Sequence, residues 1–184
     1  MILGLVDSTQ ATEKLGILIG RGGTGKSTSI GAAEYALEQL FSAGCVMKLA
    51  TTGKAATVIG GSTVHSPKYG LGVPVSEKEI KKLSGKTLQR LQERLKGVKL
   101  IVIDEYWILR ARELFFIDQI LHQVGDPEQL HGGFAVLLVG DPAQIPPVKG
   151  QVLWTDNKKS PEADKNGHLL YDSFFHNVIE LEEV

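Results

Sequence analysis

Short apolar runs recur along the chain, and polar stretches with a different spacing of apolar residues separate them. Each run is nearly continuous in apolar residues, and several end in glycine or an acidic residue. Runs of this kind predict buried β-strands. The predicted strands are KLGILIG (14–20), CVMKLA (45–50), KLIVIDE (99–105) and FAVLLVGD (134–141).

The polar stretches contain apolar residues at three- and four-residue steps, the spacing typical of amphipathic helices. One predicted helix follows the first strand and ends before Gly44, and another follows the third strand. Ser76 and Glu79 have the spacing of a capping box and predict a polar helix that runs to about Lys96. We expect surface loops at 65–74 and 155–167. The apolar positions of the two amphipathic helices are Ile30, Ala33, Leu37, Leu40 and Phe41, and Leu114, Ile117, Leu121 and Val124.

The order of these elements predicts an α/β fold with an open, mainly parallel sheet and helices on both faces. Strand 99–105 is apolar enough to be covered on both faces, so we expect it near the centre of the sheet. In such a sheet, ligands bind at the carboxyl ends of the strands. The length of 184 residues and the apolar content of 42% fit one globular domain, which we expect to span 1–184.

Charge and cysteine content restrict the partners and the compartment. The formal net charge is -1, so a nucleic acid would have to be held by a local patch rather than by the overall field. Cys45 is the single cysteine, and its apolar surroundings predict a buried thiol in a reducing compartment, the cytosol or the nucleus. The N-terminus has no basic lead and no apolar run approaches a membrane span, so we expect a soluble protein with no membrane contact.

A glycine-rich segment, GRGGTGKST (20–28), lies where the first strand should turn into the first helix. Gly20, four further residues and Gly25-Lys26-Ser27 match the phosphate-binding loop pattern in the context that the pattern requires. Glycines let successive amides point at a polyphosphate, and the helix N-terminus and the lysine add positive charge. The predicted nucleotide contacts are Gly22, Gly23, Thr24, Gly25, Lys26, Ser27 and Thr28, with Ser27 also a ligand of Mg²⁺.

Acidic residues end the third and fourth predicted strands, and an amide side chain follows the fourth. Asp104 can reach Mg²⁺, commonly through a water, and Glu105 can orient or deprotonate the attacking water. Together with the glycine-rich loop, this pair predicts a site that hydrolyses ATP or GTP. The fourth strand delivers Asp141 to the same edge, where the amide of Gln144 can bond the terminal phosphate and sense the nucleotide state. A proline-rich loop with no such role is the alternative.

In their order, four segments resemble motifs I, Ia, II and III of superfamily 1 DNA helicases of the PIF-type and Helitron branch, which is related to RecD. The segments are GRGGTGKS (20–27), TTGKAATVIGGSTVHS (51–66), VIDEYWIL (102–109) and GDPAQIPPV (140–148). The resemblance runs from about Leu15 to the last residue. It implies the first RecA-like domain of an ATP-dependent motor, one that moves 5′ to 3′ on single-stranded DNA and unwinds duplexes.

Carried over by motif, the resemblance implies a role for each site residue. Lys26 and Ser27 would bind phosphate and Mg²⁺, Asp104 would bind Mg²⁺, Glu105 would activate water, and Gln144 would couple the nucleotide state to DNA. Segment 51–66 would lie along the DNA backbone, and a capped helix with a polar turn is its alternative explanation. The expected DNA contacts are Thr51, Thr52, Gly53, Ser62, Thr63 and His65.

A basic run at 77–99 is a second place where nucleic acid could bind. Its positive charges are spread around the predicted helix, and no aromatic residues are interleaved for base stacking. This pattern favours a solvent-exposed helical face over a nucleic-acid site.

Members of the resembled family also contain an arginine-bearing motif and a second RecA-like domain beyond the point where this chain ends. We therefore expect a second RecA-like domain as a partner, in cis or in trans. Alone, the chain should be a monomer that binds Mg-ATP, hydrolyses it slowly and does not unwind DNA. Three other functions stay open: a stand-alone nucleotide-dependent switch or interaction module, a superfamily 1 RNA helicase of viral type, and a small-molecule kinase.

Overall fold

The chain folds around a six-stranded sheet. Its strands are β1 (Leu15–Gly20), β2 (Val46–Ala50), β3 (Ser62–Thr63), β4 (Leu100–Asp104), β5 (Ala135–Gly140) and β6 (Val178–Leu181). The computed structural model describes residues 2–75, 80, 82–141, 143–144, 152–154 and 159–182. Within them the strand order is β3-β2-β4-β5-β1-β6 and every strand pair is parallel, so the predicted α/β class is confirmed.

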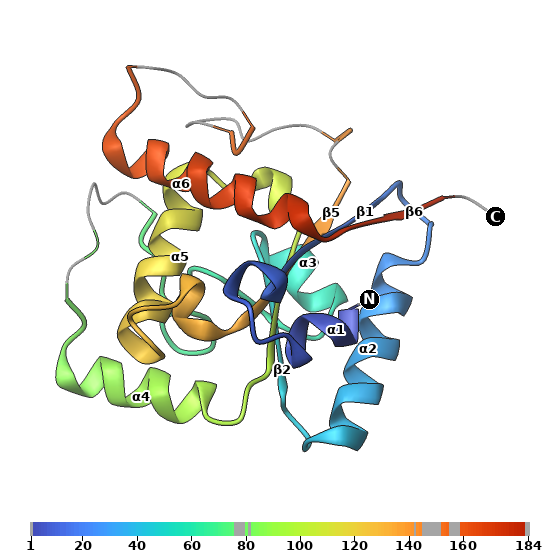
Figure 1. The fold of residues 1–184 in the computed structure, drawn as a ribbon, viewed down its shortest axis with the longest axis horizontal. Coiled ribbons are helices and arrows are strands. Elements are labelled where there is room, and N and C mark those ends of the chain that lie inside the picture. Colours follow the sequence, from blue (N-terminus) through green and yellow to red (C-terminus); the bar gives the residue numbers. More distant parts are fainter. Residues whose placement is uncertain are drawn as a thin grey trace.

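Helices cover both faces of the sheet, as predicted. They are α1 (Ile2–Asp7), α2 (Lys26–Leu40), α3 (Gly53–Val58), α4 (Gly85–Leu95), α5 (Ala111–Val124) and α6 (Glu162–Ser173). Figure 1 shows α1 and α2 on one side of the strands and α4, α5 and α6 on the other. Short 3-10 turns lie at Ala11–Lys14, Tyr106–Ile108, Leu130–Gly133 and Phe174–His176.

Strand residues alternate between two apolar layers. In β4, Leu100 and Val102 pack in the layer that contains α2, whereas Ile101 and Ile103 pack in the layer that contains α5. Because each layer needs apolar side chains from the same strand, the strands are nearly continuous apolar runs rather than alternating ones. The third predicted strand therefore lies inside the sheet, between β2 and β5, as expected.

The polar helix starts later than its capping-box pattern predicted. α4 begins at Gly85, where the hydroxyl of Ser84 accepts from the N–H of Thr87 (3.4 Å). Residues 80 and 82–84 are not helical. A continuous helix from Ser76 is therefore wrong, and the predicted capping box itself, at 76–79, lies outside the described residues.

The predicted loop at 155–167 is wrong from residue 162 onwards, where α6 begins. The carboxylate of Asp164 is completely buried and accepts from Nε and Nη2 of Arg112 on α5 (3.1 and 2.7 Å). This ion pair and the close approach of the two helices support a helix in a stretch whose composition is that of a loop. Sequence patterns also missed α1, α3, β3 and β6, which are short elements.

The cysteine and the apolar helices were the subject of two expectations from the sequence. Cys45 is a free thiol that is 1% exposed, so its predicted burial is confirmed. Among the described residues, no helix combines the length and the apolar character needed to cross a membrane.

α5 and α6 are in close contact at Gly167. A Cβ added there would lie 1.9 Å from the main-chain oxygen of Ala111, the first residue of α5. Gly31 on α2 is the opposite case, because no heavy atom of the described residues lies within 4 Å of an added Cβ.

We expect Gly167→Ala to lower the free energy of unfolding by about 1–3 kcal/mol, because the added methyl group forces the two helices apart. Gly31→Ala should raise it by up to about 1 kcal/mol, since alanine favours an exposed helix interior. Urea denaturation followed by circular dichroism measures both. Equal effects of the two substitutions would show that helix propensity, and not the close approach at Gly167, decides the outcome.

His131 is fully buried just before β5, in a left-handed backbone conformation (φ 48°). Its main-chain N–H donates to Asp118 Oδ1 on α5 (2.8 Å), and its ring packs against Phe174 with 5.4 Å between centroids. Within the described part of the chain, neither ring nitrogen has a hydrogen-bond partner. Burial lowers the pKa of His131 to about 4, against the opposing attraction of Asp118, so the ring is neutral at pH 7.

The free energy of unfolding should therefore fall as the pH drops from 6.5 towards about 4. In that window the unfolded chain binds a proton at this histidine and the folded chain does not, which removes on the order of 3 kcal/mol of stability. His131→Asn suits the left-handed backbone and should flatten this dependence in urea titrations, although it lowers stability at pH 7. Equal flattening by His176→Asn, at an exposed histidine, would rule out His131 as the source.

Candidate functional site

The residues predicted to carry function lie at one edge of the sheet, where the parallel strands end. β1 leads into the glycine-rich loop, and β4 ends at Asp104 and leads into Glu105. β5 leads into Asp141 and separates β1 from β4. Along this edge the order is segment 62–65, segment 51–53, the acidic pair, Asp141 with Gln144, and loop 20–28.

The glycine-rich loop has an open backbone with space beside it. Gly23 and Gly25 have φ values of 86° and 91°, in the left-handed region that glycine favours. No described heavy atom lies within 4 Å of a Cβ added at Gly22, Gly23 or Gly25. α2 begins at Lys26, and the first N–H groups of a helix have no carbonyl partner within that helix. These features suit a polyphosphate, whose oxygens accept from such N–H groups.

Lys26 and Asp104 carry the opposite charges of the site. Lys26 Nζ donates to the carbonyl oxygens of Gly20 (2.6 Å) and Arg21 (2.8 Å). Both acceptors are neutral, so a phosphate oxygen would be a stronger, charge-assisted partner. Burial raises the pKa of Asp104, although the N–H of Glu105 and the charge of Lys26 oppose the shift. A divalent cation beside Asp104 would favour the ionised carboxylate.

The hydroxyl residues of the loop differ in their surroundings. Thr24 Oγ1 donates to the carbonyl of Arg21 (2.9 Å) and so closes the turn of the loop. Ser27 and Thr28 are exposed at the start of α2. The structure therefore leaves the hydroxyl of Ser27 accessible to a ligand, and its role toward Mg²⁺ stays a prediction.

Glu105 has a left-handed backbone conformation (φ 55°), which only one other non-glycine residue of the described chain shares. Tyr106 and Trp107, which follow it, are buried. A Cβ added at Gly140 on β5 would lie 2.2 Å from the ring of Trp107, so this ring packs directly on the neighbouring strand. Strained residues persist where the surroundings determine them, and here the buried rings hold the turn that presents Glu105.

The structure brings Thr51 and Thr52 into contact with Glu105. Thr51 Oγ1 donates to the main-chain oxygen of Glu105 (3.1 Å), and Thr52 Oγ1 makes a long hydrogen bond to Oε2 (3.4 Å). Thr52 also caps α3, because its hydroxyl accepts from the N–H of Ala55 (3.2 Å). Gly53 is the first residue of α3. The expected DNA segment and the expected catalytic glutamate are therefore neighbours, which the sequence did not indicate.

Asp141 and Gln144 lie between the acidic pair and the loop. Asp141 is buried and accepts from the N–H of Ala143 (3.0 Å), and Nε2 of the exposed Gln144 lies 3.5 Å from its other oxygen. The prolines after Gln144 lie outside the described residues. A cleft of about 310 Å³ opens here between the loop and β6, lined by Ile19, Gly20, Arg21, Thr24, Asp141, Ala143, Glu180, Leu181 and Glu182.

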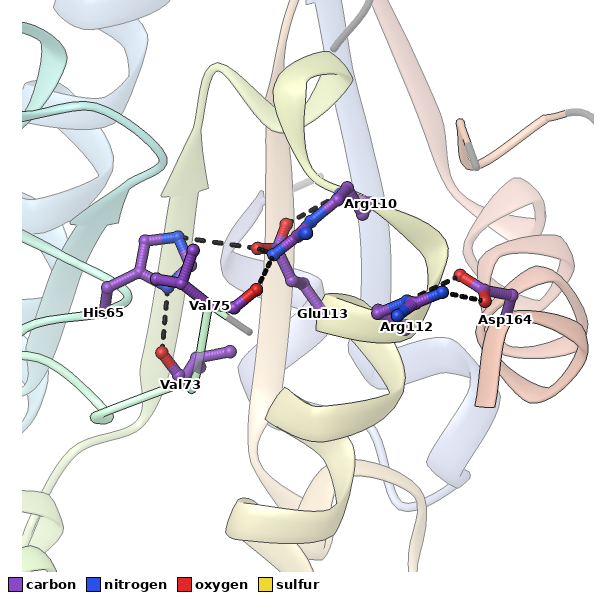
Figure 2. A network of polar contacts seen from close by, with 7 residues as sticks. All are labelled: His65, Val73, Val75, Arg110, Arg112, Glu113 and Asp164. Atoms are coloured by element: carbon purple, nitrogen blue, oxygen red, sulfur yellow. Dashed lines mark hydrogen bonds and ion pairs between the residues drawn. The ribbon is translucent and has the colours of Figure 1, made fainter. Parts of the chain in front are cut away.

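Ser62, Thr63 and His65 lie at the far end of the edge. Ser62 and Thr63 form β3 and are half-buried. Nδ1 of His65 donates to the carbonyl oxygen of Val73 (2.9 Å), and Nε2 lies 3.7 Å from Oε1 of Glu113. Figure 2 shows the His65 ring directed at Glu113 on α5. His65 therefore has structural contacts, and its role toward DNA stays a prediction.

Glu113 and Arg110 form a network that sequence patterns missed. The carboxylate of Glu113 accepts from the main-chain N–H of Arg110 (2.9 Å) and from its guanidinium, which also donates to the carbonyl of Val75 (2.6 Å), as Figure 2 shows. The network ties segment 65–75 to the start of α5. An acidic residue three positions after the N-cap residue was the available signal, but the predicted helix began only at Leu114.

The basic run at 77–99 is mostly a solvent-exposed face within its described part. Arg94 is different, because its guanidinium donates to the carbonyl oxygens of Lys68 and Gly70 and so holds the preceding loop. This arrangement agrees with the exposed helical face favoured by the sequence. The exposed basic residues are Lys82, Lys86, Arg90, Lys96 and Lys99.

The sequence matches a known protein family. A family model described as PIF1-like helicase matches residues 3–160. The chain belongs to the PIF1-like helicase family. This PIF1-like chain is 33% identical over 139 residues to the ATP-dependent DNA helicase Pif1 of Psychrobacter sp. (strain PRwf-1), and 31% identical over 130 residues to the ATP-dependent DNA helicase RRM3 of Saccharomyces cerevisiae. The matches cover 74% and 70% of this chain but 20% and 18% of the relatives, so it spans about a fifth of their length.

Solved Pif1 structures share the fold of this PIF1-like chain. All of the chain matches 41% of the Pif1 helicase from Bacteroides in complex with ADP-AlF3 and ssDNA, with a TM-score of 0.64 and 27% identity. For Pif1 helicase from Candida albicans the TM-score is 0.67 at 21% identity, over 93% of this chain and 37% of that one. The predicted RecA-like class of the sheet is thus confirmed.

We expect Glu113→Gln to lower the free energy of unfolding by about 1–3 kcal/mol, because the half-buried guanidinium of Arg110 loses its charged partner. Glu93→Gln, at an exposed position on α4, should change it by less than about 0.5 kcal/mol. Urea denaturation of the two variants measures the difference. A loss no larger for Glu113→Gln than for Glu93→Gln would mean that the network does not hold segment 65–75.

Proposed function

We propose that this chain is the RecA-like, ATP-binding and ATP-hydrolysing domain of an ATP-dependent DNA helicase. The observation that carries the proposal is the single sheet edge that bears the open phosphate loop, the acidic pair and segment 51–65. Relatives of the chain are named ATP-dependent DNA helicases, and a Bacteroides Pif1 helicase of the same fold was solved with ADP-AlF3 and ssDNA.

The phosphates of ATP would lie over residues 22–28. Lys26 would exchange its two carbonyl partners for the outer phosphates, because a charged acceptor binds an ammonium group more strongly than a neutral one. Ser27 and Asp104 would hold Mg²⁺, which when bound stabilises the charge that develops on the transferred phosphoryl group. Glu105 would orient the attacking water, and Gln144, which follows the strand between β4 and β1, would respond to the terminal phosphate.

Single-stranded DNA would cross the other end of the edge, over segments 51–53 and 62–65. The hydroxyls of Thr51, Thr52, Ser62 and Thr63 suit phosphate and sugar oxygens, which carry most contacts in backbone recognition. Translocation 5′ to 3′ and duplex unwinding would belong to a longer protein in which a second RecA-like domain closes on the nucleotide. On this proposal residues 1–184 form one monomeric domain that binds Mg-ATP and hydrolyses it slowly.

The test is calorimetric titration of the chain with ATP and excess magnesium. Lys26→Ala should weaken ATP binding about tenfold or more, because a charge-assisted hydrogen bond to phosphate contributes roughly 1.5–3 kcal/mol. Lys165→Ala, at an exposed lysine on α6, is the matched control and should bind as the parent does. An affinity unaffected by Lys26→Ala, or no binding by the parent chain, would refute the nucleotide site.

Whether the chain prefers single-stranded DNA or RNA is tested by a separate measurement. Fluorescence anisotropy of a labelled single-stranded DNA, with unlabelled DNA and RNA of the same sequence as competitors, compares the two directly. The proposal predicts that DNA competes better than RNA. Stronger competition by RNA would favour an RNA helicase, and binding of neither nucleic acid alongside ATP binding would favour a nucleotide-dependent switch module.

A further inference from the structure

Thr52 joins two parts of the site through one hydroxyl group. Its oxygen accepts from the N–H of Ala55 and so caps α3 (3.2 Å), and its proton is directed at Oε2 of Glu105 (3.4 Å). A hydroxyl carries a single proton, so it cannot donate to Glu105 and to another acceptor at the same time. A ligand that accepts the hydrogen bond of the Thr52 hydroxyl therefore breaks the bond between Thr52 and the Glu105 carboxylate.

The strand order shows in which direction Thr52 holds Glu105. Glu105 follows β4, whose neighbours are β2 on one side and β5 on the other. Thr52 follows β2, whereas the phosphate loop follows β1, beyond β5. The hydrogen bond therefore restrains the carboxylate on the side of β4 that faces away from the phosphate loop.

We propose that Thr52 is a positioning residue that restrains the Glu105 carboxylate. The restraint lasts until a phosphate of single-stranded DNA accepts the hydrogen bond of the Thr52 hydroxyl in place of Glu105. The inference rests on the proposed function, in which DNA crosses segment 51–53. With the hydroxyl engaged by DNA, the carboxylate is free to turn towards a water at the terminal phosphate. DNA binding and ATP hydrolysis are then coupled because the DNA phosphate and the Glu105 carboxylate compete for the single hydrogen bond that the Thr52 hydroxyl can donate.

Thr52→Asp separates this role from the helix cap. Aspartate is as good an N-cap as threonine, so α3 keeps its capping acceptor. Its carboxylate has no proton to donate at pH 7 and repels Glu105, so the restraint is lost. Thr52→Ser retains both the acceptor and the proton and is the conservative rescue. Ser84→Asp makes the same kind of change at the N-cap of α4, away from Glu105.

The experiment is single-turnover ATP hydrolysis by the full chain in excess over ATP, with and without single-stranded DNA. Thr52→Asp should raise the DNA-free rate constant about twofold, as expected for losing one long and therefore weak hydrogen bond, and should reduce the stimulation by DNA. The half-saturating concentration should not change, because Thr52 does not touch the phosphate loop. Thr52→Ser should restore the stimulation, and Ser84→Asp should keep the parent values.

A DNA-free rate of Thr52→Asp at or below that of the parent, including a rate equal to protein-free ATP, overturns the inference. So does an equal rise in Ser84→Asp, which would show a general effect of adding a carboxylate. Calorimetry with ATP and magnesium on every variant separates this failure from that of the proposed function. Intact ATP binding with an unchanged rate rejects the restraint alone, whereas absent binding rejects both.

Discussion

The parallel pairing of β4 between β2 and β5 is the constraint on which the whole site depends. Because parallel strands all run in one direction, the chain leaves each of them at the same edge. Residues separated by about fifty positions, such as Thr52 and Glu105, thus become neighbours without any special contact having to select them. β5 between β4 and β1 keeps the acidic pair apart from the phosphate loop and inserts Asp141 between them.

Polar groups that are buried or half-buried hold segment 65–75 against α4 and α5. The carboxylate of Glu113 accepts hydrogen bonds from the N–H and the guanidinium of Arg110 and faces His65. The guanidinium of Arg94 donates to two carbonyl oxygens of the loop at 68–70. The contacts of Arg94, Arg110 and His65 join segment 65–75 to α4 and α5. The loops can therefore carry polar, exposed residues for a ligand while the helices behind them supply the stability.

Several groups of the site are incompletely stabilised by the protein itself. Within the described residues the hydrogen-bond partners of Lys26 Nζ are two neutral carbonyls, burial raises the pKa of Asp104, and Glu105 keeps a left-handed backbone. An anionic ligand would give Lys26 a charged partner, and a divalent cation would favour the ionised carboxylate of Asp104. Such uncompensated charge and strain concentrate where a protein is shaped for a ligand rather than for its own stability. The packing of Trp107 on Gly140 shows how the surrounding core sustains them.

The sequence by itself determined the parallel sheet, its central acidic strand and the phosphate loop, because these depend on local signals. An apolar run without alternation needs two covered faces, and the left-handed φ values of Gly23 and Gly25 are conformations that glycine allows. Only the tertiary structure decided the start of α4, the helix at 162–173, the Glu113 network and the contact of Thr52 with Glu105. The last three involve a partner distant in the chain. Asp164, for example, lies in a stretch polar enough for a loop, yet Arg112 on α5 neutralises its carboxylate and lets it be buried.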